Sequence, residues 1–464
     1  MLKDDKITVK KGAKINIEIE KIIFPNTGIA YVNDNEIRIK NVLPGQKVRV
    51  LLKKKKKNYY QGRLLEVIDK SPLEEESVCN HYDNCGGCNR QAINYEKQMN
   101  IKSNQVKDLF EKNDLKYNIF KDIVPGPKIF EYRNKMEFSF GDLNKGGTIQ
   151  LGMHPQGHRF DVVSVTSCKL VDNDFRLILS TVLDYFRQKD FKKYHVISRE
   201  GYLRNLVIRK GLKTGEILVN LVTTSQTSND YSDLTKNLLN LNLDGELVGF
   251  LQTINDDYAD TIKCDELITH HGRNYFYEKL LELTFKITPF AFFQPNTFGA
   301  EKLYSTVINF ISDAKSKIIF DLYCGTGTIS QILARDADKV YGIELIEEAV
   351  EMARENATIN NDLGNCEFIA GDVLEKIDLL NDQADIIVID PPRPGIHPKT
   401  LQKIINVNTD EIIYVSCNPR TLVRDLLALT ENSYNINKIQ CIDMFPHTHH
   451  VETVVHLLKT KNDH

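Results

Sequence analysis

The sequence predicts three structural parts in series: a small all-β barrel, a β-rich central part that begins with a cysteine motif, and a doubly wound α/β domain. Three observations predict this order. Residues 1–70 contain short stretches in which apolar and polar residues alternate. Three cysteines then follow within residues 79–88. From about Phe290 onward, buried apolar stretches alternate with helical patterns, which is typical of a parallel sheet covered by helices. We place the parts at residues 1–70, 71–290 and 291–464.

The composition indicates a soluble globular protein. Of the 464 residues, 41% are hydrophobic and 27% are charged. No apolar run approaches the ~18 residues that a membrane helix needs, and the lysine-rich start lacks the apolar centre of a signal peptide. The nine cysteines then indicate a reducing compartment, in which thiols ligate metals or catalyse reactions. We expect a cytoplasmic protein that does not associate with membranes.

The charge is distributed unevenly along the chain. Residues 1–70 contain 17 Lys or Arg against 8 Asp or Glu, a net charge of +9. Because the whole chain carries −3, the rest carries −12. A basic segment on an acidic body is typical of a module that docks on a polyanion, although a solvated lysine-rich surface gives the same composition.

The alternating stretches of residues 1–70 predict a five-stranded barrel of the OB type, a frequent nucleic-acid platform. Lys53–Lys57 and Tyr59–Tyr60 add a basic, aromatic loop suited to phosphates and bases. The segment resembles a TRAM domain, a small RNA-binding barrel, in its Leu43–Gly45 and Gly28–Ala30 stretches. The expected strands are 15–20, 28–32, 36–40, 47–51 and 62–67, with turns at 25–28, 33–35 and 44–45.

The cysteine motif reads Cys79-x5-Cys85-Gly-Gly-Cys88, and the next cysteine is Cys168. Its glycines allow thiolates to converge on one centre with backbone N–H groups directed at sulfur. A structural zinc site more often repeats the Cys-x2-Cys pair. The motif resembles the [4Fe–4S] site of TRAM-containing RNA uracil-5-methyltransferases. This resemblance implies Cys79, Cys85, Cys88 and Cys168 as ligands; zinc or unligated thiols are the alternatives.

The rest of the central part predicts one long amphipathic helix and then a β-rich region. The helix lies within residues 92–117 and can pack on the C-terminal domain. Residues 129–290 read as strands with two intervening helices. Cations at alternate positions of 132–135 and 202–209 suggest an RNA-facing wall, or else a solvated sheet face.

The C-terminal part begins with a pattern for binding a nucleoside-like cofactor. The apolar strand 318–322 enters a turn with Gly325 and Gly327, which permit a ligand to approach the backbone closely. The next strand ends at Glu344, well placed to accept hydrogen bonds from ribose hydroxyls. The third glycine of a dinucleotide fingerprint is missing. This order resembles class I (Rossmann-like) S-adenosylmethionine-dependent methyltransferases, with a nicotinamide enzyme as the alternative.

Two further strands end in reactive residues. Strand 386–389 is followed by Asp390-Pro-Pro-Arg393; amino-methyltransferases close a related motif with an aromatic residue, so Arg393 argues against that activity. The strand at 412–415 ends at Ser416-Cys417-Asn418-Pro419, where proline ends the ladder and holds Asn418 extended. Cys417 then lies where open α/β sheets bind ligands. Taken alone, it is more simply a buried core thiol.

Methylation of carbon 5 of uracil would use such a cysteine. That carbon becomes nucleophilic when a thiolate adds to carbon 6, and a base must later remove its proton. Glu452, which opens the last strand, is the best-placed carboxylate, unless it is a surface acid. The nearby His447, His449 and His450 lack the further ligand of a metal site, so we expect surface or RNA-facing histidines.

Together the motifs resemble the bacterial large-subunit rRNA uracil-5-methyltransferases of the TRAM and iron–sulfur type. The matching stretches are 292–296, 321–327, 390–395, 416–419 and 450–452. The resemblance implies that S-adenosylmethionine is contacted by Gln294, Tyr323, Glu344 and Asp390, with Cys417 as the nucleophile and Glu452 as the base. Asp390 could instead, or also, bind the uracil.

The expected function is therefore methylation of carbon 5 of specific uridines in 23S rRNA through a covalent adduct of Cys417 with carbon 6. The uridine would be single-stranded or in a loop and flipped out of any stack, and we expect a monomer. The same chemistry on tRNA, and a non-catalytic RNA-binding protein, are the alternatives.

Overall fold

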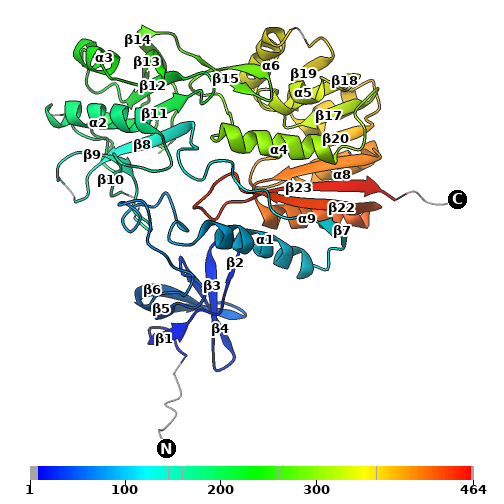
Figure 1. Ribbon diagram of the computed structural model, residues 1–464, viewed down its shortest axis with the longest axis horizontal. Coiled ribbons are helices and arrows are strands. Elements are labelled where there is room, and N and C mark those ends of the chain that lie inside the picture. Colours follow the sequence, from blue (N-terminus) through cyan, green and yellow to red (C-terminus); the bar gives the residue numbers. More distant parts are fainter. Residues whose placement is uncertain are drawn as a thin grey trace, which may run out of the picture.

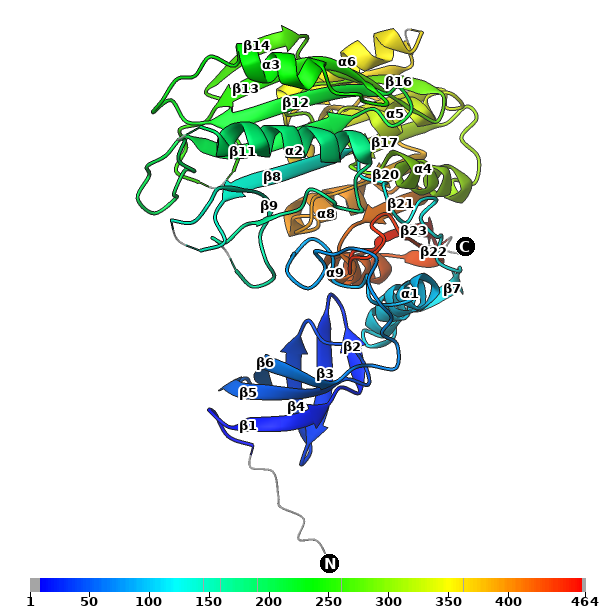
Figure 2. The same ribbon diagram turned by 60° about the vertical axis from the view of Figure 1, so that its left-hand side comes forward.

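The computed structural model describes residues 9–460, except residues 145, 159, 190, 260 and 362. The N-terminal barrel projects from a larger body that holds the other sheets (Figures 1 and 2). None of the helices in this described part of the chain has the length and apolar character to cross a membrane.

The N-terminal barrel has the alternating interior that the sequence predicts. Its sheet order is β1-β5-β6-β4-β3-β2. The continuous stretch 14–23 closes it, because β1 pairs with β5 whereas β2 pairs with β3. One strand, β2, was not expected from the sequence. The bounds are β1 Lys14–Glu18, β2 Lys21–Ile23, β3 Thr27–Val32, β4 Asn35–Lys40, β5 Lys47–Lys55 and β6 Tyr59–Asp69.

The barrel is anchored to the body through the turn between β2 and β3. Phe24 in this turn is 8% exposed and packs in the same core as Val106 and Phe110 of the body. Its carbonyl accepts a hydrogen bond from the guanidinium of Arg420. The guanidinium of Arg90 donates to the next carbonyl, that of Pro25, at 3.3 Å. The barrel therefore meets the body through packed and hydrogen-bonded groups.

The central part forms a seven-stranded sheet in the order β10-β9-β8-β11-β12-β13-β14. As expected, two helices accompany it, and apolar side chains of both pack in one core with the strands. A hairpin follows this sheet. The bounds are β8 Lys135–Gly141, β9 Gln150–Met153, β10 Val163–Ser164, α2 Asn173–Arg187, β11 Leu203–Lys210, β12 Glu216–Thr223, α3 Ser232–Leu239, β13 Glu246–Ile254, β14 Glu266–Gly272, β15 Phe276–Leu280 and β16 Leu283–Ile287.

The C-terminal part forms an eight-stranded sheet in the order β19-β18-β17-β20-β21-β23-β22-β7. The strands from β19 to β21 are parallel, and β23 is antiparallel to both of its neighbours. The bounds are α4 Thr297–Phe310, β17 Ile318–Leu322, α5 Thr328–Leu333, β18 Lys339–Glu344, α6 Glu347–Ile359, β19 Cys366–Ala370, α7 Val373–Lys376, η1 Ile377–Leu379, β20 Ile386–Ile389, α8 Pro398–Val407, β21 Glu411–Ser416, α9 Pro419–Glu431, β22 Tyr434–Ile442 and β23 Glu452–Lys459.

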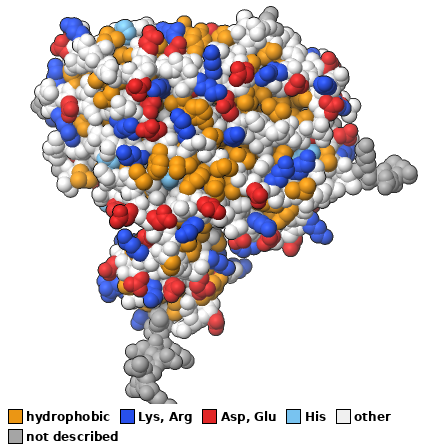
Figure 3. Space-filling model, in the orientation of Figure 1, with side chains coloured by type: hydrophobic (Ala, Val, Ile, Leu, Met, Phe, Trp, Pro, Cys, Tyr) orange, Lys and Arg blue, Asp and Glu red, His pale blue; other side chains and the backbone are white. Residues whose placement is uncertain are grey.

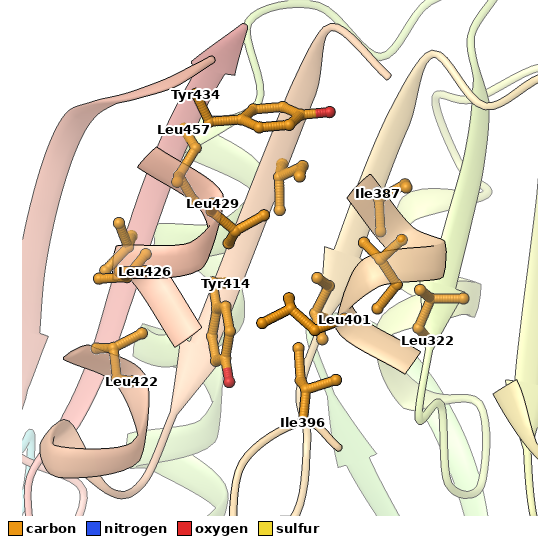
Figure 4. Close-up of a cluster of buried hydrophobic side chains, with 14 of the residues drawn as sticks. Leu322, Ile387, Ile396, Leu401, Tyr414, Leu422, Leu426, Leu429, Tyr434 and Leu457 are labelled. Carbon is orange, nitrogen blue, oxygen red and sulfur yellow. The ribbon is translucent and has the colours of Figure 1, made fainter. Parts of the chain in front are cut away.

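A segment of the predicted central part, residues 95–120, packs with the C-terminal sheet. Strand β7 (Tyr117–Phe120) pairs in parallel with β22 at the edge of the C-terminal sheet. Helix α1 (Tyr95–Glu111) contributes Val106 and Phe110 to the core beneath α9. Figure 4 shows this core, in which side chains of α8 and α9 pack on the strands around Tyr414. The segment of α1 and β7 is thus structurally part of the C-terminal sheet.

Basic and acidic side chains are interspersed on the face shown in Figure 3, over the barrel as well as the body. The basic excess of residues 1–70 therefore does not form one continuous patch on that face.

Replacement of Phe110 with alanine tests whether α1 is integral to the C-terminal core. Phe110 is fully buried in that core, and removing a buried phenylalanine side chain typically costs about 3–5 kcal/mol. We expect Phe110→Ala to lower the free energy of unfolding by this amount in urea titrations. Lys107→Ala, on the exposed side of the same helix, should change it by less than about 0.5 kcal/mol. Equal small effects of both variants would contradict the assignment.

Candidate active site

The carboxyl ends of the parallel strands form one wall of a large pocket with a volume of about 1280 Å³. Small-molecule sites are usually about 300–1,000 Å³, so this pocket has room for two ligands side by side. It lies where β17 and β20 adjoin, the point at which the strand order reverses. All six of the predicted cofactor-binding and catalytic residues line it: Gln294, Tyr323, Glu344, Asp390, Cys417 and Glu452.

The glycine turn after β17 is fixed by its contacts with β18 and β19. The amides of Tyr323 and Cys324 both donate to the carbonyl of Ile343 at 3.0–3.1 Å. Gly327 has φ +74°, and a Cβ there would lie 2.7 Å from the ring of Phe368. Only glycine fits both requirements at this position.

Glu344 lies beside this turn at the end of β18 and faces the pocket. One oxygen of its carboxylate accepts from the amide of Gly325 at 3.1 Å, and the other accepts from the amide of Ile346 at 3.0 Å. Each carboxylate oxygen can accept a second hydrogen bond. The two bonds therefore orient Glu344 and leave it able to receive hydroxyl donors from a ligand.

Gln294 precedes α4 and is held by groups from the central sheet. The side-chain amide of Asn134 donates to the carbonyl of Gln294 and to the hydroxyl of Thr297, each at 2.9 Å. The hydroxyl of Thr297 donates in turn to buried Glu278 at 2.6 Å. This chain of bonds sets the backbone of Gln294. The Gln294 side chain hydrogen bonds with Tyr304, a buried pocket residue that the sequence analysis did not single out.

Cys417 lies in the turn that joins β21 to α9. Pro419 is the first residue of α9, and Asn418 is extended (φ −136°, ψ 94°), as the sequence predicts. The Asn418 side chain donates to the carbonyl of Arg393 at 3.0 Å. Cys417 is half-buried and lines the pocket, so it is not simply a core thiol. The structure thus presents it to a ligand.

Glu452 reaches the same end of the sheet from the antiparallel strand β23. Ser416 of β21 pairs with Thr453 of β23, so Cys417 and Glu452 flank one rung of the sheet. Glu452 is 4% exposed, which excludes a surface acid. The two residues lie far apart in sequence and become neighbours only through this pairing.

Burial raises the pKa of every acidic group at the centre of the site. It raises the pKa of Asp390 to about 7, and that of Glu452, with the added charge of Asp390, to about 8. It also raises the pKa of the Cys417 thiol to about 11, where the two carboxylates act in the same direction. Arg393 at the pocket rim opposes these shifts, lowering the pKa of both Cys417 and Glu452. The site therefore holds protons that its side chains can exchange.

The four predicted cluster ligands, Cys79, Cys85, Cys88 and Cys168, line a second, small pocket. None of them forms a disulfide, and apolar neighbours such as Met136, Met153 and Val165 surround them. The amide of Gly87 donates to the sulfur of Cys85 at 3.3 Å. Within the described ranges, however, no group of three or more His, Cys, Asp or Glu side chains could hold a metal ion. Four soft thiols in apolar surroundings fit an iron–sulfur group better than a hard cation.

The expectation of exposed cations was wrong for the stretch 202–209, because Arg204 and Arg209 are buried. In the stretch 132–135, Arg133 and Lys135 are half-buried between buried Tyr132 and Asn134, and Arg133 lines the large pocket. The hydroxyl of Tyr132, for example, donates to the carbonyl of Pro446 at 3.0 Å. The alternation of apolar and polar residues in the sequence does not predict hydrogen bonds between polar groups of different domains.

The histidines before Glu452 are likewise not at the surface. His447 is 3% exposed, and His449 and His450 are half-buried. Burial lowers the pKa of His447 and His449 to about 4 and that of His450 to about 3, so all three are neutral near pH 7. Of the three, His450 lines the pocket.

The chain is similar over nearly its whole length to known proteins. A Clostridium tetani protein described as an RNA methyltransferase is 52% identical over 97% of this chain and 99% of its own. One from Caldanaerobacter subterraneus is 45% identical over 96% and 98%. The Pyrococcus abyssi tRNA (uracil-54, C5)-methyltransferase, solved with S-adenosyl-L-homocysteine, is 26% identical, with a TM-score of 0.75 over 96% of this chain and all of its own.

Two family models match the sequence. The TRAM domain model matches residues 8–65, as the barrel's strand pattern predicts. The model described as tRNA (Uracil-5-)-methyltransferase matches residues 94–460, which include every residue of the large pocket. The chain therefore belongs to the tRNA (uracil-5-)-methyltransferase family and carries a TRAM domain at its N-terminal side.

Proposed function

We propose that the protein transfers a methyl group from S-adenosylmethionine to carbon 5 of a uridine in 23S rRNA. The observation that carries this proposal is the pairing of β21 with β23, which brings a thiol and a buried carboxyl to one pocket beside a glycine turn. The pocket volume of about 1280 Å³ supports the simultaneous presence of a cofactor and a uracil. We further propose a cytoplasmic monomer.

The cofactor half of the pocket supports S-adenosylmethionine, which supplies the methyl group when bound. We assign Glu344 to the ribose hydroxyls, because its carboxylate is oriented but not saturated. Gln294 and Tyr323 line the same region and would contact the rest of the molecule. Asp390 lies between this region and Cys417; it would contact the cofactor, the uracil or both.

The other half of the pocket supports covalent catalysis. The thiolate of Cys417 adds to carbon 6 of the uracil, and the resulting enolate makes carbon 5 nucleophilic toward the methyl group. The carboxylate of Glu452 then removes the proton from carbon 5. The electrons of that C–H bond form the new double bond between carbons 5 and 6, and the Cys417 thiolate leaves. A uridine must leave its stack to reach a thiol at this depth.

A second candidate substrate is tRNA. The Pyrococcus abyssi enzyme, a tRNA (uracil-54, C5)-methyltransferase, matches 96% of this chain with its own whole length. Because this match extends over nearly the whole chain, the barrel and the cysteine motif do not by themselves favour rRNA over tRNA. The proposed rRNA target rests on the motif resemblance alone.

Incubation with methyl-labelled S-adenosylmethionine and total RNA tests the proposed function. We expect label in 5-methyluridine of 23S rRNA, located by mass spectrometry of nuclease fragments. Label in tRNA would select the second candidate, and absence of labelled RNA would contradict both. Cys417→Ala should release no hydrogen from carbon 5 of tritiated uridine, because the covalent step is lost. Cys366→Ala, which removes a half-buried thiol that does not line the large pocket, should behave like the wild type.

The pKa of Glu452 predicts the pH dependence of hydrogen release from carbon 5. Because burial raises this pKa to about 8, the carboxyl carries a proton below pH 8 and is a base above it. Measured from the preformed methylated adduct, in which Cys417 is already bonded to carbon 6 and its thiol pKa of about 11 has no influence, the rate should rise about tenfold per pH unit below pH 8 and level off above it. Glu452→Gln should lower the rate by about 100-fold or more and abolish this dependence. Glu355→Gln, an exposed acid paired with Lys286, should keep the wild-type profile; a flat wild-type profile would contradict the role.

We also propose that Cys79, Cys85, Cys88 and Cys168 hold a [4Fe–4S] cluster. Support comes from their position around one apolar pocket, since a cluster takes one thiolate at each iron and is larger than a single ion. The reaction described above transfers no electron, so we assign the cluster a structural role.

Metal content tests this assignment. Protein purified without oxygen should contain iron and acid-labile sulfide, and Cys168→Ser should lower both. Cys264→Ser is the matched control and should retain both. Stoichiometric zinc in place of iron would contradict the cluster.

A further inference from the structure

The loop that leads into Glu452 is fixed by groups from outside the C-terminal sheet. This loop, residues 443–451, connects β22 to β23 and ends at the proposed base. Three segments hydrogen bond to it: helix α1, the segment around Tyr132, and the loop that follows the third cysteine, residues 89–91. The position of Glu452 at the start of β23 therefore depends on segments more than 300 residues away in the chain.

Helix α1 hydrogen bonds to the first half of this loop, residues 443–447. The ammonium of Lys102 donates to the carboxylate of Asp443 at 2.6 Å and to the carbonyl of Phe445 at 3.0 Å. The side chains of Lys102 and Asp443 are both 0% exposed. Gln98, one turn earlier, accepts from the amide of His447 at 3.0 Å, and its own amide hydrogen bonds to the ring of that histidine at 3.1 Å. Any arrangement of the loop that separated this pair would leave a buried charge without its partner, which is strongly destabilising.

The cysteine part holds the second half of the loop. The backbone amides of Asn89 and Arg90, directly after Cys88, both donate to the carbonyl of His447 at 3.1 Å. The side-chain amide of Asn89 hydrogen bonds to the ring of His449 at 2.6 Å. Two consecutive amides can donate to one carbonyl only if the backbone of residues 88–90 has a defined conformation. Gln91 ties this segment to the four-thiol pocket: its side-chain oxygen accepts from the amide of Cys79 at 2.7 Å, and its side-chain amide donates to the sulfur of Cys88 at 3.9 Å.

The backbone of His447 has a conformation that is unfavourable without contacts from the rest of the protein. Its φ is +67°, a left-handed backbone that a residue with a side chain seldom adopts. Such a conformation persists where the surroundings determine it and is typical of functional sites. Here the ring of Phe130 stacks on the His447 ring at 4.4 Å between centroids, in addition to the hydrogen bonds above.

We propose that Lys102, Asn89 and the cysteine loop form a clamp on residues 443–451 that positions Glu452 for removal of the carbon 5 proton. Lys102 and Asn89 are positioning residues. This inference rests on the proposed function. It assigns the four-thiol pocket a structural role, in which the pocket helps to position Glu452 and transfers no electrons.

The clamp acts on the base and not on the nucleophile. Cys417 is fixed by a different set of contacts, those of Asn418 with Arg393 and of the Ser416 hydroxyl with the Asn418 amide at 3.1 Å. Thiolate addition and methyl transfer precede proton removal. Loosening the clamp should therefore leave the early steps intact and stall the reaction at the methylated covalent adduct.

The double variant Lys102→Met/Asp443→Asn tests the clamp without leaving one buried charge unpaired. In single-turnover reactions we expect methyl transfer within about threefold of wild type and release of the carbon 5 proton slowed by about 100-fold, the usual share of a positioned base. The methylated protein–RNA adduct should then accumulate on denaturing gels. Lys193→Met/Asp142→Asn removes a partly buried pair of the central part and should not accumulate adduct. Equal slowing of both steps, or of neither, in a folded variant would overturn the proposal.

Hydrogen exchange tests the clamp without any RNA. In the full-length protein, Cys88→Ser should raise amide exchange in residues 443–451 by at least about tenfold, because local opening there becomes easier, and should leave β12 unchanged. Asn89→Ala should act in the same direction more weakly, and it serves where the double variant does not fold. Unchanged exchange in the loop would overturn the clamp. By contrast, wild-type protein that methylates no RNA would reject the proposed function, while the exchange result would still decide on the clamp.

Discussion

The antiparallel insertion of β23 between β21 and β22 is the constraint on which the site depends. A sheet of parallel strands alone would place Cys417 at its carboxyl edge without a base beside it. Because β23 runs in the opposite direction, its first residue, Glu452, starts at the edge where β21 ends. The glycine turn and Glu344 end at that same edge, so a cofactor and a base-bearing pocket share one wall. Removal of this one pairing would separate the two chemical halves.

The electrostatics of the pocket follow from the burial of several carboxyl groups at this edge of the sheet. Burial raises the pKa of Asp321 and of Asp390 to about 7 and that of Glu452 to about 8, and the charge of Asp390 adds to the rise at both Asp321 and Glu452. The hydroxyl of Ser330 donates to Asp321 at 2.5 Å and offsets part of that rise. Arg393 is the cation that opposes the rise at Glu452. It occupies the position where amino-methyltransferases carry an aromatic residue, and it gives the site a charge where those enzymes would stack a base.

Much of this arrangement could be predicted from the sequence because it is local. The strand that ends at Cys417, the turn at Gly327 and the acid at Glu344 each follow from a few adjacent residues. The pairing of β7 with β22 and the burial of Tyr132 could not be predicted, since their partners lie hundreds of residues away. The burial of the histidines after Pro446 could not be predicted for the same reason. Polar residues in a loop are expected to be exposed when their distant hydrogen-bond partners are unknown.

Trapping of the covalent intermediate tests the central claim most directly. RNA in which uridine is replaced by 5-fluorouridine can accept the Cys417 thiolate and the methyl group, but it offers no proton at carbon 5 for a base to remove. Incubated with S-adenosylmethionine and the wild-type protein, it should yield a denaturant-resistant protein–RNA complex. Peptide mapping by mass spectrometry should locate the methylated nucleotide on Cys417. A trapped nucleotide on any other residue, or methylated product without an adduct, would contradict the account.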